Sequence, residues 1–269
     1  MNNLIKRTIT GIIFLALVIG AIVFHKISFF ILFELIIIFS MYEFYALAEK
    51  ENYRPQKLYG IIIGAILFAA TFFYVNQYIG IKVFLPLIIL IAGIFIIELY
   101  RKSNQILADI GFTLLGIIYI ALPLTLANYI VLHNGSYHWT ILLGFFILTW
   151  TFDTLAYIFG ISFGKHRLFE RISPKKSWEG FIGGLIFTMA ASYPISLLFT
   201  ELTFFQWSFA AIIVSVVGTY GDLVESSLKR NHDKKDSGKI LPGHGGMLDR
   251  FDAILLSLPM FFVFLQIIH

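Results

Sequence analysis

The chain contains no cysteine, and only 13% of its 269 residues are charged. The absence of cysteine excludes disulfide bonds, thiolate nucleophiles, and zinc or iron–sulfur sites with Cys ligands. Soluble domains carry about 25% charged residues. The low charge content excludes a disordered chain, a basic nucleic-acid-binding domain and an ordinary cytosolic enzyme. Hydrophobic residues make up 58% of the sequence, and the mean hydropathy is +0.84. These values are typical of a polytopic membrane protein.

The apolar residues are gathered into segments long enough to cross a bilayer, which requires roughly 20 residues in a helix. Nine segments are predicted to span, at residues 8–24, 27–47, 58–75, 83–100, 108–132, 139–160, 180–199, 205–221 and 251–268. They are continuously apolar and do not alternate, which favours helices over a β-barrel. The first segment resembles a signal peptide, but further spans follow at once, so it is interpreted as an uncleaved helix.

The positive charges give this topology an orientation. With nine spans, 18 of the 20 Lys and Arg residues lie on the side of the N-terminus, and only Lys26 and Lys82 lie on the other. Because positive charge is enriched in cytoplasmic loops, the N-terminus is predicted to be cytoplasmic and the C-terminus outside. The fold class is therefore all-α: a multi-pass integral protein of the cell membrane with about nine transmembrane helices. Without internal repeats or linkers, residues 1–269 are expected to form a single membrane domain.

The polar stretch from residue 218 to 252 starts at the inner end of the eighth span. If the helix continues beyond the span, Asp222, Glu225, Ser226 and Lys229 fall on one face, because three- and four-residue spacings follow the helical period. This face could carry chemistry, or it could be a solvated helix end.

A second acidic pair stands at the start of the ninth span. Asp249 and Asp252 are three residues apart, so they also share a helical face. Carboxylates without cysteine suit Mg²⁺, which takes one or two carboxylates together with substrate phosphates. The structural alternative is a helix start, with Asp249 as N-cap and Asp252 favoured by the helix dipole.

Glycine-rich sequence lies between these acidic pairs. Residues 242–246, Pro-Gly-His-Gly-Gly, cannot be helical, and their glycines let backbone N–H groups approach an anion. A plain loop is the alternative. His244 could donate to an anion, act as a general acid or be a surface histidine, and the first interpretation is favoured.

The other long inner loop, residues 161–179, is basic. Pro174 predicts a turn before the seventh span, and Lys175 and Lys176 stand just ahead of a helix N-terminus, which attracts anions. Ordinary positive-inside charge explains these lysines equally well, and binding to anionic lipid headgroups is a further alternative.

Acidic residues also lie within spans or near their ends. Asp153 lies in the sixth span, where a carboxylate is energetically costly. Its presence there suggests a polar cavity that opens toward the cytoplasm. The alternative is an Asp that pairs with a buried partner and serves only packing. Glu43 and Glu98 are close to inner span ends, where long side chains can extend to water, and they are given no role. The tryptophans near span ends, Trp207 among them, are interpreted as interfacial anchors.

Several motifs together resemble the phosphatidate cytidylyltransferase family, also called CDP-diglyceride synthetases. Within residues 226–252 they are Ser226, Leu228-Lys229-Arg230, Lys235-Asp236, Gly238, Leu241-Pro242, His244-Gly245-Gly246, Asp249-Arg250 and Asp252. Outside this region they are Tyr42-Glu43-Phe44, Asp153-Thr154, Ala156-Tyr157, Gly160, residues 173–180 (Ser-Pro-Lys-Lys-Ser-Trp-Glu-Gly) and Gly221-Asp222. The resemblance covers most of the chain. At every defining position of the family's signature, this sequence has the expected residue.

The resemblance implies an enzyme that makes CDP-diacylglycerol and pyrophosphate from CTP and phosphatidic acid, with Mg²⁺. It implies that Asp222 and Asp249 hold the metal, and that basic residues hold the phosphates. The expected catalytic residues are Asp222, Lys229, Arg230, His244, Asp249 and Arg250. The expected substrate-binding residues are Asp153, Ser173, Lys175, Lys176, Ser226, Lys235, Gly245 and Gly246. The expected metal ligands are Asp222, Glu225, Asp249 and Asp252.

The lipid phosphate would attack the α-phosphorus of CTP in line. Because the attacking oxygen is already anionic, reducing the repulsion between the two anions matters more than supplying a strong base. Membrane lipids are expected partners, nucleic acid is not, and a homodimer is left open. Two other functions are weighed against this one. A CTP-dependent polyprenol or other lipid kinase would release CDP, and an ion-coupled transporter would move solute without using CTP.

Overall fold

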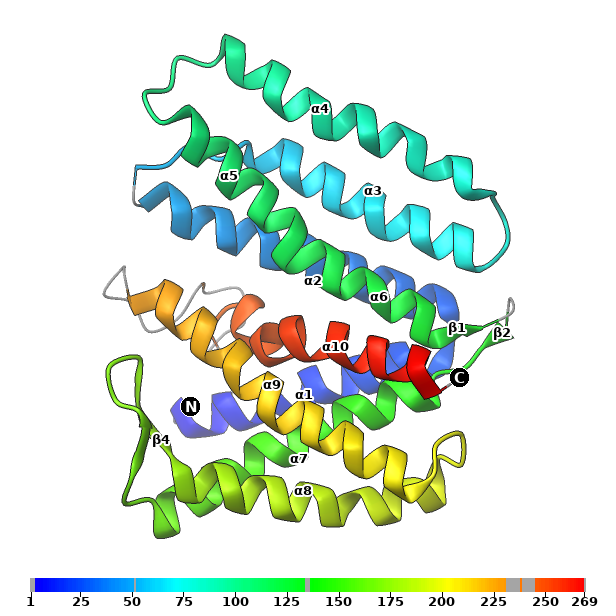
Figure 1. Ribbon diagram of the computed structural model, residues 1–269, viewed down its shortest axis with the longest axis vertical. Helices are drawn as coiled ribbons and strands as arrows, with labels where there is room; N and C mark the ends of the chain where they lie inside the picture. Colours follow the sequence, from blue (N-terminus) through cyan, green and yellow to red (C-terminus); the bar gives the residue numbers. More distant parts are fainter. Residues whose placement is uncertain (1–2, 51, 134–135, 231–237, 239–244, 269) are drawn as a thin grey trace. The chain divides into compact units, whose positions relative to one another are not determined.

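The computed structural model describes residues 3–50, 52–133, 136–230, 238 and 245–268. The chain forms two compact units (Figure 1). The first unit comprises Met1–His138 and His232–Arg250, and the second comprises Trp139–Asn231 and Phe251–His269. Each unit is built from two separate segments of the chain, because residues 232–250 belong to the first unit although they lie between the two segments of the second. The single membrane domain expected over residues 1–269 stays a prediction.

The first unit is a set of apolar helices with one short hairpin. Its elements are α1 (Asn3–Phe24), α2 (Lys26–Lys50), α3 (Lys57–Val75), the 3₁₀ turn η1 (Ile81–Phe84), α4 (Leu85–Tyr100), α5 (Ile106–Gly116), the π-helical η2 (Ile117–Ala121), α6 (Leu122–Val131), β1 (Leu132–His133) and β2 (Ser136–Tyr137). Segments α5, η2 and α6 form one continuous span. The π turn precedes Pro123, which has no backbone N–H to donate to the carbonyl four residues back, and this favours a wider turn.

Tyr45 of α2 organises the core of the first unit. Its side chain is fully buried, and its hydroxyl donates to the backbone carbonyl of Thr113 in α5 at 2.8 Å. Gly60 of α3 and Gly116 of α5 face the ring so closely that a Cβ at either position would overlap the phenol. These two glycines therefore allow α3 and α5 to pack on α2 around one buried aromatic side chain.

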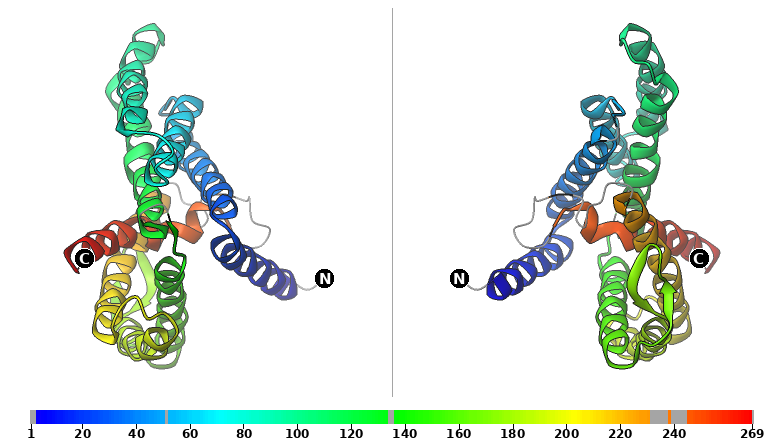
Figure 2. Two further views of the ribbon diagram at one scale, coloured as in Figure 1. Left: turned by 90° about the vertical axis from the view of Figure 1, so that its right-hand side faces the viewer. Right: turned by 90° about the vertical axis from the view of Figure 1, so that its left-hand side faces the viewer.

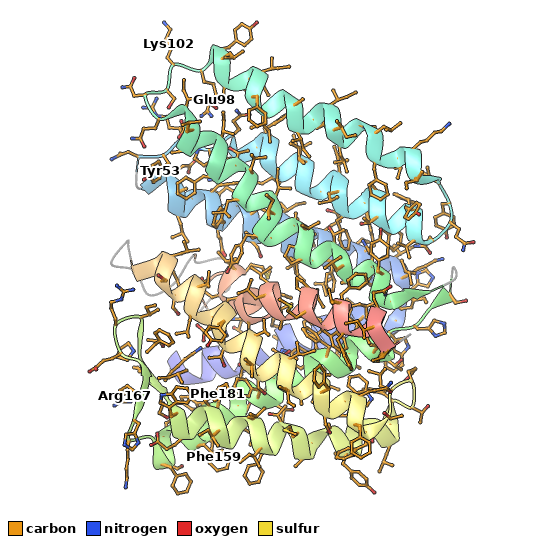
Figure 3. The ribbon with its side chains drawn as sticks, viewed as in Figure 1. Tyr53, Glu98, Lys102, Phe159, Arg167 and Phe181 are labelled. Atoms are coloured by element: carbon orange, nitrogen blue, oxygen red, sulfur yellow. The ribbon has the colours of Figure 1, made fainter. Side chains whose placement is uncertain are left out.

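The second unit contains four long helices and a β-hairpin. Its elements are α7 (Thr140–Phe163), β3 (Arg167–Phe169), β4 (Ser173–Ser177), α8 (Trp178–Leu198), α9 (Phe204–Arg230) and most of α10 (Leu248–Ile268). Where α7 and α8 join, Gly180 and Gly184 lie against Ala156, so the two backbones approach closely. Phe181 packs edge-on against Phe152 in the same contact (Figure 3).

The loop between the sixth and seventh spans is a β-hairpin, so the prediction of a simple turn at Pro174 is wrong. Strands β3 and β4 pair antiparallel, with Arg167 opposite Ser177 and Phe169 opposite Ser173, and the hairpin extends beyond the joined ends of α7 and α8 (Figures 1 and 2). Pro174 lies inside β4. A two-stranded sheet has only edge strands, where a residue without a backbone N–H is tolerated.

Within the part of the chain that the structure describes, eight helices are long and apolar enough to cross a membrane, which confirms the all-α multi-pass fold class. Within the described part of α1, the apolar stretch Thr10–Phe24 is shorter than these eight. The count of nine spans and the cytoplasmic placement of the N-terminus therefore stay predictions. Helix α4 leaves Ile88, Ile89 and Leu99 largely exposed, as expected of a helix that faces lipid.

Candidate active site

The C-terminal part of α9 carries the first group of polar side chains. Helix α9 continues to Arg230, nine residues beyond the expected end of the span at residue 221, so the shared helical face is confirmed. The Ser226 hydroxyl donates to Asp222 Oδ1 at 3.0 Å. One turn further along, Glu225 forms an ion pair with Lys229, and both residues are buried. The face thus presents Asp222 beside a buried pair of opposite charges.

The hairpin brings the second basic loop to this acidic face. Lys176 Nζ in β4 lies 2.5 Å from Asp222 Oδ2, and the two side chains are 27% and 36% exposed. The two long polar loops predicted from the sequence therefore meet within the second unit. Lys175, the neighbouring residue in β4, is exposed, and Ser173 is half-buried at the start of the strand.

The base of the hairpin is fixed to the start of α8. Ser177 caps this helix by accepting the backbone N–H of Gly180 at 3.2 Å, as expected of a Ser N-cap. The Glu179 carboxylate accepts the backbone N–H groups of Lys165 and His166 at 3.1 and 3.2 Å, and lies 2.6 Å from His166 Nδ1. These bonds hold the hairpin against the start of α8. Lys176, which is part of the hairpin, is thereby placed where it contacts Asp222.

Helices α9 and α10 pack closely beside the same carboxylate. A Cβ at Gly221 would lie 2.5 Å from the backbone carbonyl oxygen of Asp252 and 3.1 Å from Cα of Ala253. The absence of a side chain at this position therefore lets α10 approach α9 next to Asp222. Asp252 interacts electrostatically with Asp222 of α9 and with Asp153 of α7.

The second unit thus collects carboxylates from three helices. Asp153 lies ten residues before the C-terminal end of α7 and is exposed on its own unit, so the predicted polar cavity around it stays a prediction. Among the described residues, no three His, Asp or Glu side chains are arranged to hold a metal ion by themselves. Glu225, one of the four expected metal ligands, has Lys229 as its partner.

Asp249 belongs to the first unit, where it shapes the start of α10. It lies in the first turn of the helix, and its Oδ2 accepts the backbone N–H of Gly246 at 2.7 Å. Gly245 has a φ of 82°, a left-handed conformation that favours glycine. The expected non-helical glycine turn is thus present at these two residues. Because Asp222 belongs to the other unit, its predicted convergence with Asp249 stays a prediction.

The remaining expected site residues are described only in part. Lys235 and His244 lie outside the described residues, and for Arg230 only the backbone is described. Arg250 is exposed, and its backbone N–H donates to the carbonyl of Met247 at 3.0 Å. The roles assigned to these four residues stay predictions.

Two carboxylates that were expected to extend to water are instead buried in the first unit. Glu98 is 1% exposed, accepts a hydrogen bond from Gln56 Nε2 at 2.8 Å, and pairs with Arg101 at 2.9 Å (Figure 3). Glu43 is 3% exposed, and one of its oxygens accepts the backbone N–H of Leu248 at 2.9 Å. The resemblance of Tyr42-Glu43-Phe44 to the family was the signal that could have drawn attention to Glu43.

An open cavity of about 730 Å³ lies beside the hairpin. Its lining residues are Lys165, His166, Arg167, Glu170, Trp178, Glu179 and Ile182. The lining combines three basic side chains with the carboxylates of Glu170 and Glu179 and with the apolar side chains of Trp178 and Ile182 (Arg167 is labelled in Figure 3).

Comparison with known proteins places these features in one family. Residues 5–268 match the model of the cytidylyltransferase family. A phosphatidate cytidylyltransferase of Staphylococcus haemolyticus (strain JCSC1435) is 42% identical over 177 residues, which are 64% of this chain and 66% of that protein. The phosphatidate cytidylyltransferase of Bacillus subtilis (strain 168) is 38% identical over 175 residues, 62% of each chain. These alignments span slightly less than two thirds of the relatives' lengths. The family match covers nearly the whole chain, and the chain therefore belongs to the cytidylyltransferase family.

Proposed function

We propose that this protein transfers the cytidylyl group of CTP to phosphatidic acid at the cytoplasmic face of the cell membrane, giving CDP-diacylglycerol and pyrophosphate. The observation that carries the proposal is the contact between Lys176 of the basic hairpin and Asp222 of α9. In this contact a lysine, a residue type that binds phosphate, lies beside an aspartate, a residue type that binds metal ions, near the ends of apolar helices. Membership of the family and the names of the relatives support the same reaction.

The residues present fit a divalent cation. Among the described residues, Asp252 interacts with Asp222, Asp153 and Lys229, while Asp222 pairs with Lys176 and Glu225 pairs with Lys229. The donors are hard carboxylate oxygens, which suit Mg²⁺. Asp222 and Asp252 are the proposed ligands within the second unit, and the metal-binding role of Asp249 stays a prediction from the sequence. When bound, Mg²⁺ would offset charge on the triphosphate and on the leaving pyrophosphate.

The chain's own residues would act mainly by positioning and charge. The attacking oxygen of phosphatidic acid is already anionic, so the reaction needs no strong general base. The main obstacle is repulsion between two anions. Lys176 and Lys175 on the hairpin, and Lys229 and Arg230 on α9, would neutralise phosphate oxygens and hold attacking and leaving oxygens in line. Ser226 orients the Asp222 carboxylate through its hydrogen bond, and no covalent intermediate is required.

The apolar helices explain how a soluble nucleotide and a membrane lipid could meet. Asp222 lies in the C-terminal part of the apolar helix Phe204–Lys229, directly after the segment expected from the sequence to end at residue 221, and Lys176 stands two residues before the span α8. Both are therefore near the level of lipid headgroups, where the phosphate of phosphatidic acid lies. A homodimer, also left open by the sequence, stays a prediction.

The test is incubation of the purified full-length protein in detergent or liposomes with [α-³²P]CTP, phosphatidic acid and Mg²⁺. Label in a lipid product, with release of unlabelled pyrophosphate, is the expected result. A lipid kinase would instead leave the label in CDP and transfer the γ-phosphate, so a parallel reaction with [γ-³²P]CTP separates the two. Solute flux into liposomes without consumption of CTP would indicate a transporter and overturn the proposal.

A further inference from the structure

Glu43 is a buried carboxylate in α2, more than 200 residues before the segment with which it interacts. It is 3% exposed within a helix that is apolar enough to span the membrane. A carboxylate in such a place is costly and needs compensation. Its neighbours on α2 have other surroundings: Tyr42 is exposed with Lys57 Nζ 3.8 Å from its ring centroid, and Phe44 is buried against Tyr119. The Glu43 side chain is thus directed away from the apolar packing of Phe44.

One oxygen of Glu43 caps the last helix. Oε2 accepts the backbone N–H of Leu248, the first residue of α10, at 2.9 Å. The first N–H groups of a helix have no partner within the helix, and the positive end of its dipole favours a negative charge. Glu43 therefore acts on α10 as a charged N-cap residue would, although it is supplied by another helix.

The other oxygen of Glu43 faces Gly238. A Cβ built at Gly238 would overlap Oε1, and its three nearest atoms would be Oε1, Cδ and Cγ of Glu43. The chain can pass this close to the carboxylate only because residue 238 has no side chain. Gly238 and Leu248 are ten residues apart, so one carboxylate contacts both ends of the segment 238–248.

We propose that Glu43 is a positioning residue that holds Leu248, the first residue of α10, against Gly238 and thereby orients Asp249. Asp249 directly follows the capped residue, and its own Oδ2 is held by the Gly246 N–H. Loss of Glu43 would free the start of α10 and, with it, the Asp249 carboxylate. The inference rests on the proposed function only in its second part, the role of Asp249 in binding Mg²⁺.

Hydrogen exchange of the full-length protein in detergent tests the first part without any activity measurement. The amide of Leu248 should exchange roughly 3- to 30-fold faster in Glu43→Ala, as expected for loss of an N-cap acceptor. The same is expected in Glu43→Asp, because the side chain that carries the carboxylate is one methylene shorter. Glu98→Ala is the matched control, because Glu98 is an equally buried carboxylate of the same unit with other partners. Leu248 exchange at the wild-type rate in both Glu43 variants, or equal acceleration in Glu98→Ala, would overturn the proposal.

Gly238→Ala adds a specific test of the close approach. Alone, it should accelerate exchange at Leu248, because the new Cβ displaces the Glu43 carboxylate. In the Glu43→Ala background the same substitution should have little further effect, since the atoms that it would meet are gone. Additive effects of the two substitutions would contradict a shared contact.

The second part is tested by the Mg²⁺ dependence of the reaction. Glu43→Asp should raise the Mg²⁺ concentration for half-maximal rate by roughly 10-fold or more, the effect expected when a group that orients a metal ligand is lost. Glu98→Ala should leave this concentration unchanged even if it lowers thermal stability. An unchanged Mg²⁺ midpoint in Glu43→Asp, with faster Leu248 exchange, would overturn the link to Asp249. Lack of any product from the wild-type protein would instead count against the proposed function.

Discussion

Replacing Lys176 with glutamine tests how the second unit balances charge around Asp222. The Lys176 ammonium contacts Oδ2, one of the two oxygens with which Asp222 would bind Mg²⁺. Removing the ammonium removes a competitor for that oxygen, so Mg²⁺ should bind more tightly in the absence of nucleotide. The same substitution removes a positive charge available to the triphosphate, so CTP should bind more weakly. The two affinities are therefore expected to change in opposite directions.

The size of each change follows from the exposure of the pair. Lys176 and Asp222 are 27% and 36% exposed, so solvent screens their attraction. Partly exposed ion pairs contribute about 0.2–1 kcal/mol, which corresponds to roughly 1.4- to 5-fold tighter Mg²⁺ binding at about 1.4 kcal/mol per tenfold. A charge-assisted hydrogen bond to a phosphate is worth about 1.5–3 kcal/mol. Its loss should raise the KM for CTP by roughly 10- to 150-fold.

Isothermal titration calorimetry without CTP gives the Mg²⁺ affinity, and initial rates of pyrophosphate release give the KM for CTP. Lys165→Gln is the matched control, because it removes the same charge from the same hairpin at an exposed position. The gain in Mg²⁺ affinity should shrink at about 1 M salt, where the Debye length is about 3 Å. Equal or weaker Mg²⁺ binding by Lys176→Gln, or the same gain in Lys165→Gln, would refute the competition between the lysine and the metal.

Three further substitutions test the site and its packing. Asp222→Asn should lower the rate of CDP-diacylglycerol formation by roughly 10- to 100-fold or more, while the unfolding free energy changes by no more than about 1 kcal/mol, the contribution of a partly exposed ion pair; near-normal activity would contradict its role as a metal ligand. Gly221→Ala places a Cβ 2.5 Å from a backbone carbonyl of α10 and should destabilise the protein by about 1–3 kcal/mol, lowering the unfolding midpoint. Gly111→Ala, with nothing within 4 Å of the added atom, should not lower it, and equal midpoints would argue against the close contact. Glu225→Ala leaves the buried Lys229 without this carboxylate and should cost about 3–5 kcal/mol. The Glu225→Leu/Lys229→Met double variant should lose less stability in chemical denaturation, and an equal loss would contradict a buried pair.

The sequence predicted the elements that depend on local periodicity. The apolar segments became helices within a few residues of their expected ends, because continuous apolar runs have few other stable forms in lipid. The shared face of Asp222, Glu225 and Lys229 was predicted on the condition that the helix continues beyond residue 221, and α9 meets this condition because it extends to Arg230. These residues could therefore be grouped before any coordinates were known.

What the sequence did not predict depends on contacts between distant residues. The hairpin at 167–177 is too short and too polar for a periodic signal. Trp207 was expected at the membrane interface, yet its side chain is fully buried against Gly144, with Nε1 donating to the Phe199 carbonyl at 3.1 Å. Nothing near Trp207 in sequence shows that a glycine on α7 leaves room for its ring. Glu43 is a comparable case, because its partners, Leu248 and Gly238, lie about 200 residues away.

The cluster of carboxylates in the second unit is difficult to explain by stability alone. Asp153, Asp222 and Asp252 come from three helices, and Asp252 interacts through space with both of the others. Acidic side chains in apolar helices are costly, and well-packed apolar residues in place of buried charges are often neutral or stabilising. If packing were the only requirement, apolar side chains at the α9–α10 contact would serve it better, since Gly221 and Ala253 already provide the close fit. A cation that binds the folded protein would repay the cost of the carboxylates. Mg²⁺ should therefore raise the unfolding midpoint of the wild-type protein more than that of Asp222→Asn, and an equal shift in both would show that the ion binds elsewhere.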